Sequence, residues 1–263
     1  MIPRIGLGTW QNTDPEQCAE SVKTALELGY RHIDTAQFYK NEEYVGKGLN
    51  QSDVPRGEII LATKVWIDRL GHEDLKKSVD KSLERLDTAY IDLLYVHWPA
   101  GKYDPEGTFK AMGELVDEDK IKHIGVSNFT PVLLDEALKV SEYSIIANQV
   151  ETHPLNQQDE MLKYLQEKDM TLVAYSPLAR GNVMDIPELQ EIAEKHDVSE
   201  AQVSLAWLWS HEKVAAIPKG TSKEHIQENL DAANLRLDNE DIKKIQSIDK
   251  EKRLIDPAFA PDW

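Results

Sequence analysis

Four polar residues of this chain could together donate a proton to a substrate. Asp34 lies in YRHIDTA, Tyr39 follows it closely, Lys64 emerges from the apolar run LATKVW, and His97 follows another apolar run in YVHWP. Each alone has an ordinary structural explanation, such as a helix cap for the aspartate or a core position for the histidine. A buried lysine, however, needs a carboxylate partner. Taken together, the four residue types predict a proton-donor site.

Eight short aliphatic or β-branched runs are candidates to position these residues. They are typical of buried parallel strands and span residues 4–9, 31–35, 59–63, 91–96, 122–126, 146–150, 171–175 and 214–218. Amphipathic helical patterns separate or follow them, at residues 15–28, 73–86, 105–116, 131–140, 158–168, 187–195, 199–210, 223–232 and 239–248.

This alternation predicts the α/β class and a closed (β/α)8 TIM barrel. An open doubly wound sheet would favour GxGxxG after an early strand, but Gly6 and Gly8 have no third glycine at the right offset. We expect one domain over residues 1–263, with an extra C-terminal helix and a short C-terminal loop.

Polar residues gather at the carboxyl ends of these predicted strands. In a barrel those ends meet on one face, where active sites are built. Besides Asp34, Lys64 and His97, the residues at these ends are Ser127, Asn128, Gln149, Tyr175 and Lys219.

The formal net charge of −17 disfavours nucleic acid and anionic membrane surfaces as partners. A single cysteine, Cys18, fits a packed thiol in a reducing cytosol. No signal peptide or membrane-length apolar run is visible, so we expect a cytoplasmic protein, and a monomer by default because no interface motif stands out. HExxH, CxxC, GxSxG and Walker A patterns are absent, so no metal site is expected.

Several motifs in order carry a family resemblance. They are GLGTW (6–10), GYRHIDTAQFYKNEEYVG (29–46), LATKVW (61–66), IDLLYVHWP (91–99), IGVSNF (124–129), NQVETHP (148–154), YSPLARG (175–181) and IPKGTSKEHIQEN (217–229). Over essentially its whole length the chain resembles the aldo-keto reductases, in particular their compact prokaryotic branch of 2,5-diketo-D-gluconate reductase-like enzymes. The resemblance implies reduction of aldehydes and ketones to alcohols by hydride transfer from a nicotinamide cofactor.

The resemblance also assigns catalytic roles. It implies a tetrad in which Tyr39 is the general acid in reduction and the base in oxidation. An unaided phenol, with a pKa near 10, is a poor acid at neutral pH. Lys64 is expected to lower that pKa, Asp34 to hold the lysine, and His97 to orient the carbonyl or relay the proton.

A cofactor site follows from the same resemblance. Ser127, Asn128 and Gln149 should hold the nicotinamide carboxamide, and Tyr175 should stack on its ring. Glu228 and Asn229 should contact adenine. The remaining implied contacts, to phosphates and nearby groups, are Gly8, Thr9, Trp10, Asp34, Ser176, Leu178, Lys219, Gly220, Thr221 and His225.

His225 departs from the family pattern. Relatives that prefer the phosphorylated cofactor usually carry arginine six residues after the lysine of IPK. Neutral imidazole cannot make the bidentate charged contact that guanidinium makes with phosphate. We therefore expect NADPH to be preferred and NADH to be possible, with weaker discrimination than in the family and more NADPH preference at low pH.

Aromatic residues are expected to wall the substrate pocket. Trp10, Trp66 and Trp98 each follow a predicted strand and should surround the substrate together with Tyr39 and His97. Trp263 could fold over the site or be disordered, and a short C-terminal loop suggests an open, tolerant pocket. Helix packing is expected for the remaining pair, Trp207 and Trp209. Such walls favour carbonyl compounds with an apolar or aromatic portion.

Two other functions remain open from sequence. Lys64 could form a Schiff base, as in an aldolase, although this would not explain Tyr39 or the IPKGTS segment. The chain could also be a non-catalytic sensor or regulatory subunit that binds the cofactor, although the intact tetrad argues against it.

Overall fold

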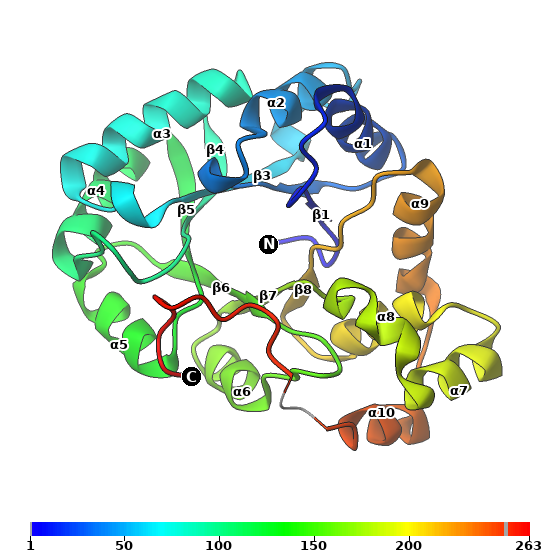
Figure 1. The fold of residues 1–263 in the computed structure, drawn as a ribbon. Helices are drawn as coiled ribbons and strands as arrows, with labels where there is room; N and C mark the ends of the chain where they lie inside the picture. Colours follow the sequence, from blue (N-terminus) through cyan, green and yellow to red (C-terminus); the bar gives the residue numbers. More distant parts are fainter. Residues whose placement is uncertain (1, 250–251) are drawn as a thin grey trace.

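Eight parallel strands run in sequence order around a barrel (Figure 1). The computed structural model describes residues 2–249 and 252–263. The strands are β1 (Leu7–Gly8), β2 (His32–Asp34), β3 (Ile60–Val65), β4 (Ile91–Val96), β5 (Ile121–Ser127), β6 (Ile145–Glu151), β7 (Thr171–Tyr175) and β8 (Val214–Ala216). The sheet closes because Ile5 forms a parallel bridge with Ala216, whose carbonyl accepts from the Gly6 N–H at 2.9 Å. The predicted barrel is confirmed.

Helices cover the outside of the strands (Figure 1). They are α1 (Pro15–Glu27), α2 (Glu42–Asn50), α3 (His72–Leu86), α4 (Pro105–Asp117), α5 (Pro131–Val140), α6 (Asp159–Glu167), α7 (Pro187–His196), α8 (Glu200–Ser210), α9 (Lys223–Asp231) and α10 (Asn239–Gln246). Local signals explain several starts: Pro15 and Pro105 open helices whose first turns are capped by Asp14 and Asp104.

Helix α2 was not predicted from the sequence. Two of its residues are glycines, and its apolar face is short, so the helical pattern is weak. The structure explains both glycines by close backbone approach. A Cβ at Gly46 would lie 2.6 Å from the Leu86 carbonyl oxygen, and one at Gly48 would lie 2.5 Å from that of Ala19. A side chain at either position would therefore keep α2 from packing closely against α1 and α3.

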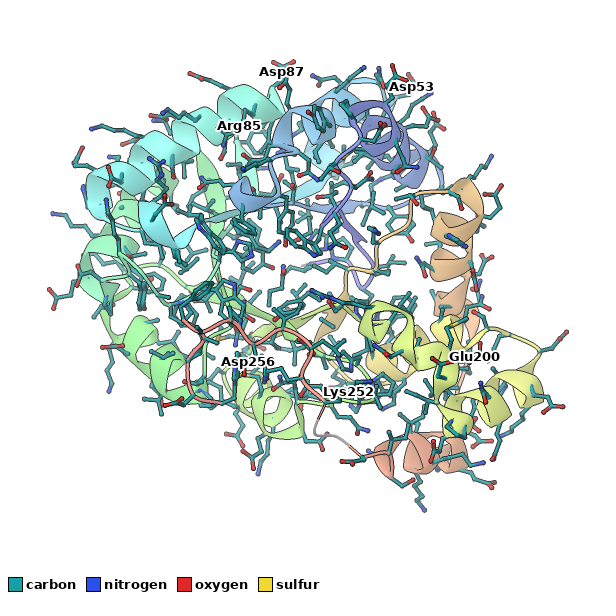
Figure 2. All side chains as sticks on the ribbon, viewed as in Figure 1. Asp53, Arg85, Asp87, Glu200, Lys252 and Asp256 are labelled. Carbon is teal, nitrogen blue, oxygen red and sulfur yellow. The ribbon has the colours of Figure 1, made fainter. Side chains whose placement is uncertain are left out.

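Side chains fill the barrel interior. A small inner cluster comprises Ala62, Leu93, Tyr95, Ala147, Val173, Ala215 and Ile217. A larger cluster lies between strands and helices, and there Trp207 and Trp209 are buried, as their predicted helix packing requires. Acidic side chains such as Asp53 and Asp87 lie on the outer surface (Figure 2).

Predicted strand ends differ slightly from the observed ones, and two differences concern candidate site residues. Lys64 lies inside β3 rather than after it, and Ser127 is the last residue of β5. Both still lie close to the carboxyl ends of their strands. The strand predicted over residues 4–9 is reduced to Leu7–Gly8 plus the bridge at Ile5.

Candidate active site

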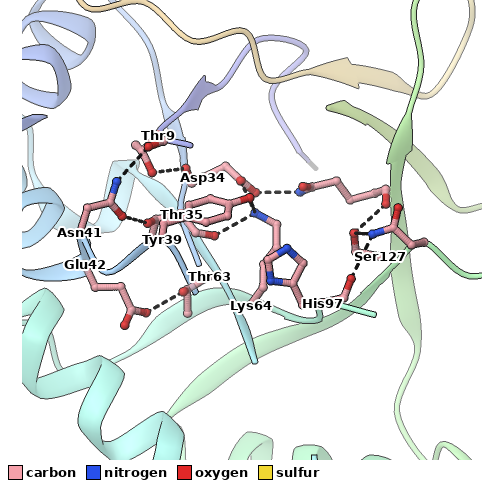
Figure 3. Close-up of polar contacts among 12 residues, drawn as sticks. Thr9, Asp34, Thr35, Tyr39, Asn41, Glu42, Thr63, Lys64, His97 and Ser127 are labelled. Carbon is pink, nitrogen blue, oxygen red and sulfur yellow. Dashed lines mark hydrogen bonds and ion pairs between the residues drawn. The ribbon is translucent and has the colours of Figure 1, made fainter. Parts of the chain in front are cut away.

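The four predicted catalytic residues meet at the carboxyl end of the barrel (Figure 3). Asp34 ends β2, and Tyr39 ends a short 3-10 helix (Gln37–Tyr39) that follows it. The Lys64 ammonium nitrogen lies 3.2 Å from the Tyr39 hydroxyl and forms a close ion pair with the Asp34 carboxylate. It also donates to the Thr35 carbonyl oxygen at 2.9 Å. The lysine thus has the carboxylate partner that its sequence context predicted.

Burial controls the charge states here. The side chains of Asp34 and Lys64 are each 1% exposed. Burial lowers the pKa of Lys64, but Asp34 and Tyr39 outweigh it, so the pKa lies above its ordinary value and the ammonium is retained. The pKa of Tyr39 is also raised, because burial of the phenol outweighs the opposing effect of Lys64. Lys64 thus lowers the pKa of Tyr39, as the sequence predicted, but burial makes the net shift upward, so the protonated phenol is the favoured form.

The His97 imidazole completes the cluster in its neutral form. Burial, reinforced by the charge of Lys64, holds its pKa well below the usual 6.5. Its ring lies edge-on to Tyr39, with centroids 5.7 Å apart. Among the described residues, its buried Nδ1 has no hydrogen-bond partner. A neutral imidazole can donate one N–H to a substrate oxygen, which fits the orienting role better than transfer of its own cationic proton.

A second polar network joins the predicted carboxamide residues to this cluster. The Gln149 amide nitrogen donates to Asp34 at 2.7 Å, and the Ser127 hydroxyl donates to the Gln149 backbone carbonyl at 2.8 Å. The Asn128 amide nitrogen donates to the His97 carbonyl at 3.1 Å, and its oxygen accepts from the Tyr175 hydroxyl at 2.8 Å. The ends of β5, β6 and β7 are thus connected to the proton-donor cluster.

Both networks line one cavity of about 630 Å³. It brings together most of the predicted site residues: Gly8, Thr9, Trp10, Asp34, Tyr39, Trp66, His97, Trp98, Ser127, Asn128, Gln149, Tyr175, Ser176, Leu178 and Lys219. Lys64 lies behind this surface, bonded to Asp34 and Tyr39.

Five predicted cofactor contacts lie outside that lining, within the part of the chain the structure describes: Gly220, Thr221, His225, Glu228 and Asn229. They occupy the turn before α9 and the helix itself, where Ser222 caps the first turn. His225 is exposed, whereas the Glu228 carboxylate accepts from the Ser199 hydroxyl that begins α8. Glu228 is therefore bonded to the start of a neighbouring helix.

Sequence reasoning missed several lining residues. Phe38 stacks on Trp66 with centroids 4.0 Å apart, although its position next to Tyr39 could have indicated it. The others are Gln11, Pro177, Arg180, Gly181, Ile217, Pro218, Ile255, Pro257 and Phe259.

The C-terminal segment contributes more than its length suggested. Phe259 lies edge-on to Trp66 and Trp98, at centroid distances of 5.9 and 5.6 Å. The short C-terminal loop therefore forms part of the pocket wall, and the prediction of an open, tolerant pocket stays a prediction. The Trp263 ring packs on the Arg253 guanidinium at 3.8 Å, and Trp263 is not among the residues that line the cavity.

The donor set fits a nicotinamide dinucleotide. Tyr175 offers an aromatic face, the adjacent amides match a carboxamide, and Lys219 and Arg180 bring two cations to the lining of a strongly acidic protein. The loop after β7 turns sharply there, with positive φ at Ser176, Ala179 and Arg180.

Within residues 2–249 and 252–263, no helix is long and apolar enough to cross a membrane.

Comparison with known proteins identifies one family. Residues 4–250 match the model of the aldo/keto reductase family. The chain is 42% identical to glyoxal reductase of Bacillus subtilis (96% of this chain, 91% of the relative) and 40% identical to methylglyoxal reductase DkgB of Escherichia coli O157:H7 (100% and 99%). A crystal structure of MGS-M4, an aldo-keto reductase from a Medee basin deep-sea metagenome library, superposes with a TM-score of 0.94 at 36% identity, covering 100% of this chain and 97% of that one.

The chain therefore belongs to the aldo/keto reductase family. It is an oxidoreductase whose reaction is nicotinamide-dependent reduction of carbonyl compounds, as the sequence motifs predicted. Neither the aldolase nor the sensor hypothesis gains support from these relatives.

Proposed function

We propose that Tyr39 is the general acid of this reductase, with Lys64, Asp34 and His97 as its supporting residues. The observation that carries the proposal is the 3.2 Å contact between the Tyr39 hydroxyl and a buried ammonium whose charge is secured by Asp34. Asp34, Tyr39 and His97 line the cavity, and of these Tyr39 and His97 can donate a proton to substrate, whereas Asp34 is ion-paired with Lys64.

The chemistry follows from these charge states. The cofactor, when bound, supplies the hydride. As the substrate carbon is reduced, negative charge develops on its oxygen, and Tyr39 delivers a proton there. The remaining phenolate is stabilised by the adjacent Lys64 ammonium, which Asp34 holds in place. Neutral His97 orients the carbonyl through a ring N–H. In the oxidative direction, the Tyr39 phenolate takes the proton back.

The cofactor proposed is NADPH, with NADH as a weaker alternative. Ser127, Asn128 and Gln149 would hold the carboxamide and Tyr175 the ring; Ser176, Leu178 and the stretch 219–221 would hold phosphates. The turn before α9 would meet the adenosine end. His225 is exposed at that end. Its imidazole carries a positive charge only when protonated, so it should favour the extra phosphate of NADPH only in that form.

The NADPH/NADH ratio of kcat/KM tests the cofactor proposal. It should be higher at acidic than at alkaline pH and should become independent of pH, at a higher value, in His225→Arg. A ratio that is flat across this range in the wild type would contradict the role of His225.

The substrates proposed are aldehydes and ketones with an apolar or aromatic portion. The supporting observation is the aromatic wall of Trp10, Phe38, Trp66, Trp98 and Phe259. A panel should also contain glyoxal and methylglyoxal, because two relatives are named for these compounds. We further propose that the chain acts as one barrel domain and a monomer, which light scattering would test.

The decisive experiment compares wild type with Tyr39→Phe. We expect kcat to fall by about 10²–10⁴-fold, since the general acid is lost. Cofactor affinity, measured by quenching of tryptophan fluorescence, should change little. If Tyr39→Phe retained wild-type kcat, Tyr39 would not be the acid. If wild type bound cofactor tightly but reduced nothing, the sensor hypothesis would be favoured instead.

A further inference from the structure

A buried carboxylate outside the tetrad holds the C-terminal segment, residues 252–263, at the mouth of the barrel. Glu151, the last residue of β6, has a side chain with 0% exposure. Its Oε1 accepts from the Leu254 backbone N–H at 2.6 Å, and its Oε2 accepts from the Ile255 N–H at 2.8 Å. Both carboxylate oxygens are thus bonded to consecutive amides of a segment more than one hundred residues away in sequence.

The surroundings of Glu151 explain why this contact is strong. Among the described side chains, His153 also bonds to it, with Nε2 3.0 Å from Oε1, and the Arg253 guanidinium interacts with it electrostatically. A buried carboxylate is costly unless it is fully hydrogen-bonded, and charge-assisted bonds to backbone N–H groups are among the strongest available. The segment therefore supplies donors that Glu151 requires, and Glu151 in return fixes the path of the segment.

That path leads directly to the cavity. Ile255, Pro257 and Phe259 all line it, and Phe259 completes an aromatic corner with Trp66 and Trp98. The segment, red in Figure 1, crosses the mouth on the side of β6 and β7, and Lys252 and Asp256 mark its course in Figure 2.

Strand β6 links the segment to the catalytic cluster. Residues two apart in a strand point to the same face. The side chain of Glu151 therefore lies on the same face of β6 as that of Gln149, which donates to Asp34. One strand end therefore bonds to the proton-donor cluster through Gln149 and to the pocket wall through Glu151.

We propose that Glu151 is a positioning residue that sets the outer wall of the substrate pocket and thereby selects for bulky, aromatic carbonyl substrates. It acts through the C-terminal segment and touches neither the reacting atoms nor the cofactor. The inference rests on the proposed location of the substrate in this cavity.

Glu151→Gln provides the first test. The glutamine side chain has one acceptor oxygen, so its amide nitrogen must face the N–H of either Leu254 or Ile255. One of the two hydrogen bonds is then lost, and the two N–H donors repel each other. Hydrogen exchange at the amides of residues 254 and 255 should accelerate at least tenfold. KM for an aromatic aldehyde should rise about three- to tenfold, the effect of losing aromatic contacts, while kcat, KM for methylglyoxal and cofactor affinity change less than about twofold.

Two further variants keep the test decisive. Leu254→Pro removes the residue 254 donor without altering β6. Even if Glu151→Gln folds poorly, this variant should accelerate exchange at the residue 255 amide and raise KM for the aromatic aldehyde. Glu167 is an exposed glutamate on α6. Glu167→Gln is therefore the matched control and should change neither the hydrogen exchange of the segment nor KM for the aromatic aldehyde. The exchange measurement needs no turnover, so it separates this inference from the proposed function. If exchange at residue 255 in both folded variants, exchange at residue 254 in Glu151→Gln, and KM for the aromatic aldehyde all stay at wild-type values, Glu151 does not position the wall.

Discussion

Two buried aspartates lie at opposite ends of the barrel and have different surroundings. Asp34, at the carboxyl end of β2, pairs with Lys64, and both side chains are 1% exposed. Asp92, near the amino end of β4, is 4% exposed in its side chain and pairs with Arg56 at 2.7 Å and Lys122 at 3.0 Å, whose side chains are 25% and 46% exposed. Asp92 also accepts from the Leu61 N–H at 3.1 Å.

The difference teaches that location decides the role of a buried carboxylate. Asp34 borders the cavity and fixes an ammonium next to a tyrosine hydroxyl. Asp92 has no described partner on the cavity lining, and its cations also pack on the Tyr90 ring at 4.1 and 3.8 Å. The carboxyl end of a barrel carries chemistry, whereas the amino end contributes stability.

Removing the buried cation should have the largest effect. Lys64→Met leaves Asp34 buried without its ion pair, so the free energy of unfolding should fall by about 3–5 kcal/mol. The pKa of Tyr39 should rise further because Lys64 opposes its elevation, so kcat should also fall by at least about 10²-fold. Urea unfolding and steady-state assays would measure both. A stable, fully active Lys64→Met would break the distinction between the two aspartates.

His32 gives an intermediate effect that depends on pH. It is fully buried between the two ends, and burial lowers its pKa to about 4, with smaller effects from Asp34, Lys64 and Asp92. As pH falls, the unfolded chain protonates near 6.5 and the folded one only near 4. The contribution of neutral His32 to the free energy of unfolding is therefore complete above pH 6.5 and falls by about 3 kcal/mol as the pH is lowered to 4.

Urea unfolding at pH 7 and pH 4.5 would measure this loss. In His32→Leu the difference between the two pH values should be smaller than in wild type by roughly 2–3 kcal/mol. An unchanged difference would show that another group, such as His97, accounts for the acid sensitivity.

Asp92→Ala should have the smallest effect and sharpens the comparison most directly. It leaves the Leu61 N–H without its acceptor, so stability should fall by about 1–3 kcal/mol. Activity should stay within about twofold of wild type, because the nearest cations are partly solvated and remote from the cavity. A loss of kcat without a loss of stability would contradict a purely structural role for Asp92.

Local sequence signals account for much of this fold and site. The helix starting at Pro15, the apolar strands and the motifs around Asp34, Lys64 and His97 were all recognisable, because burial patterns and caps are properties of short stretches. Helix α2 was missed because its glycines weaken local propensity and only gain meaning from their contacts with α1 and α3.

By itself, the sequence determined the alternation of strands and helices, the residue types at the carboxyl end, and the family. Only the tertiary structure decided the direction of the Tyr39 pKa, because that depends on how much burial opposes one ammonium. It also decided the place of the C-terminal segment, whose path is set by hydrogen bonds to Glu151 from residues far away in the chain. Such long-range contacts leave no periodic pattern, whereas burial along a strand does.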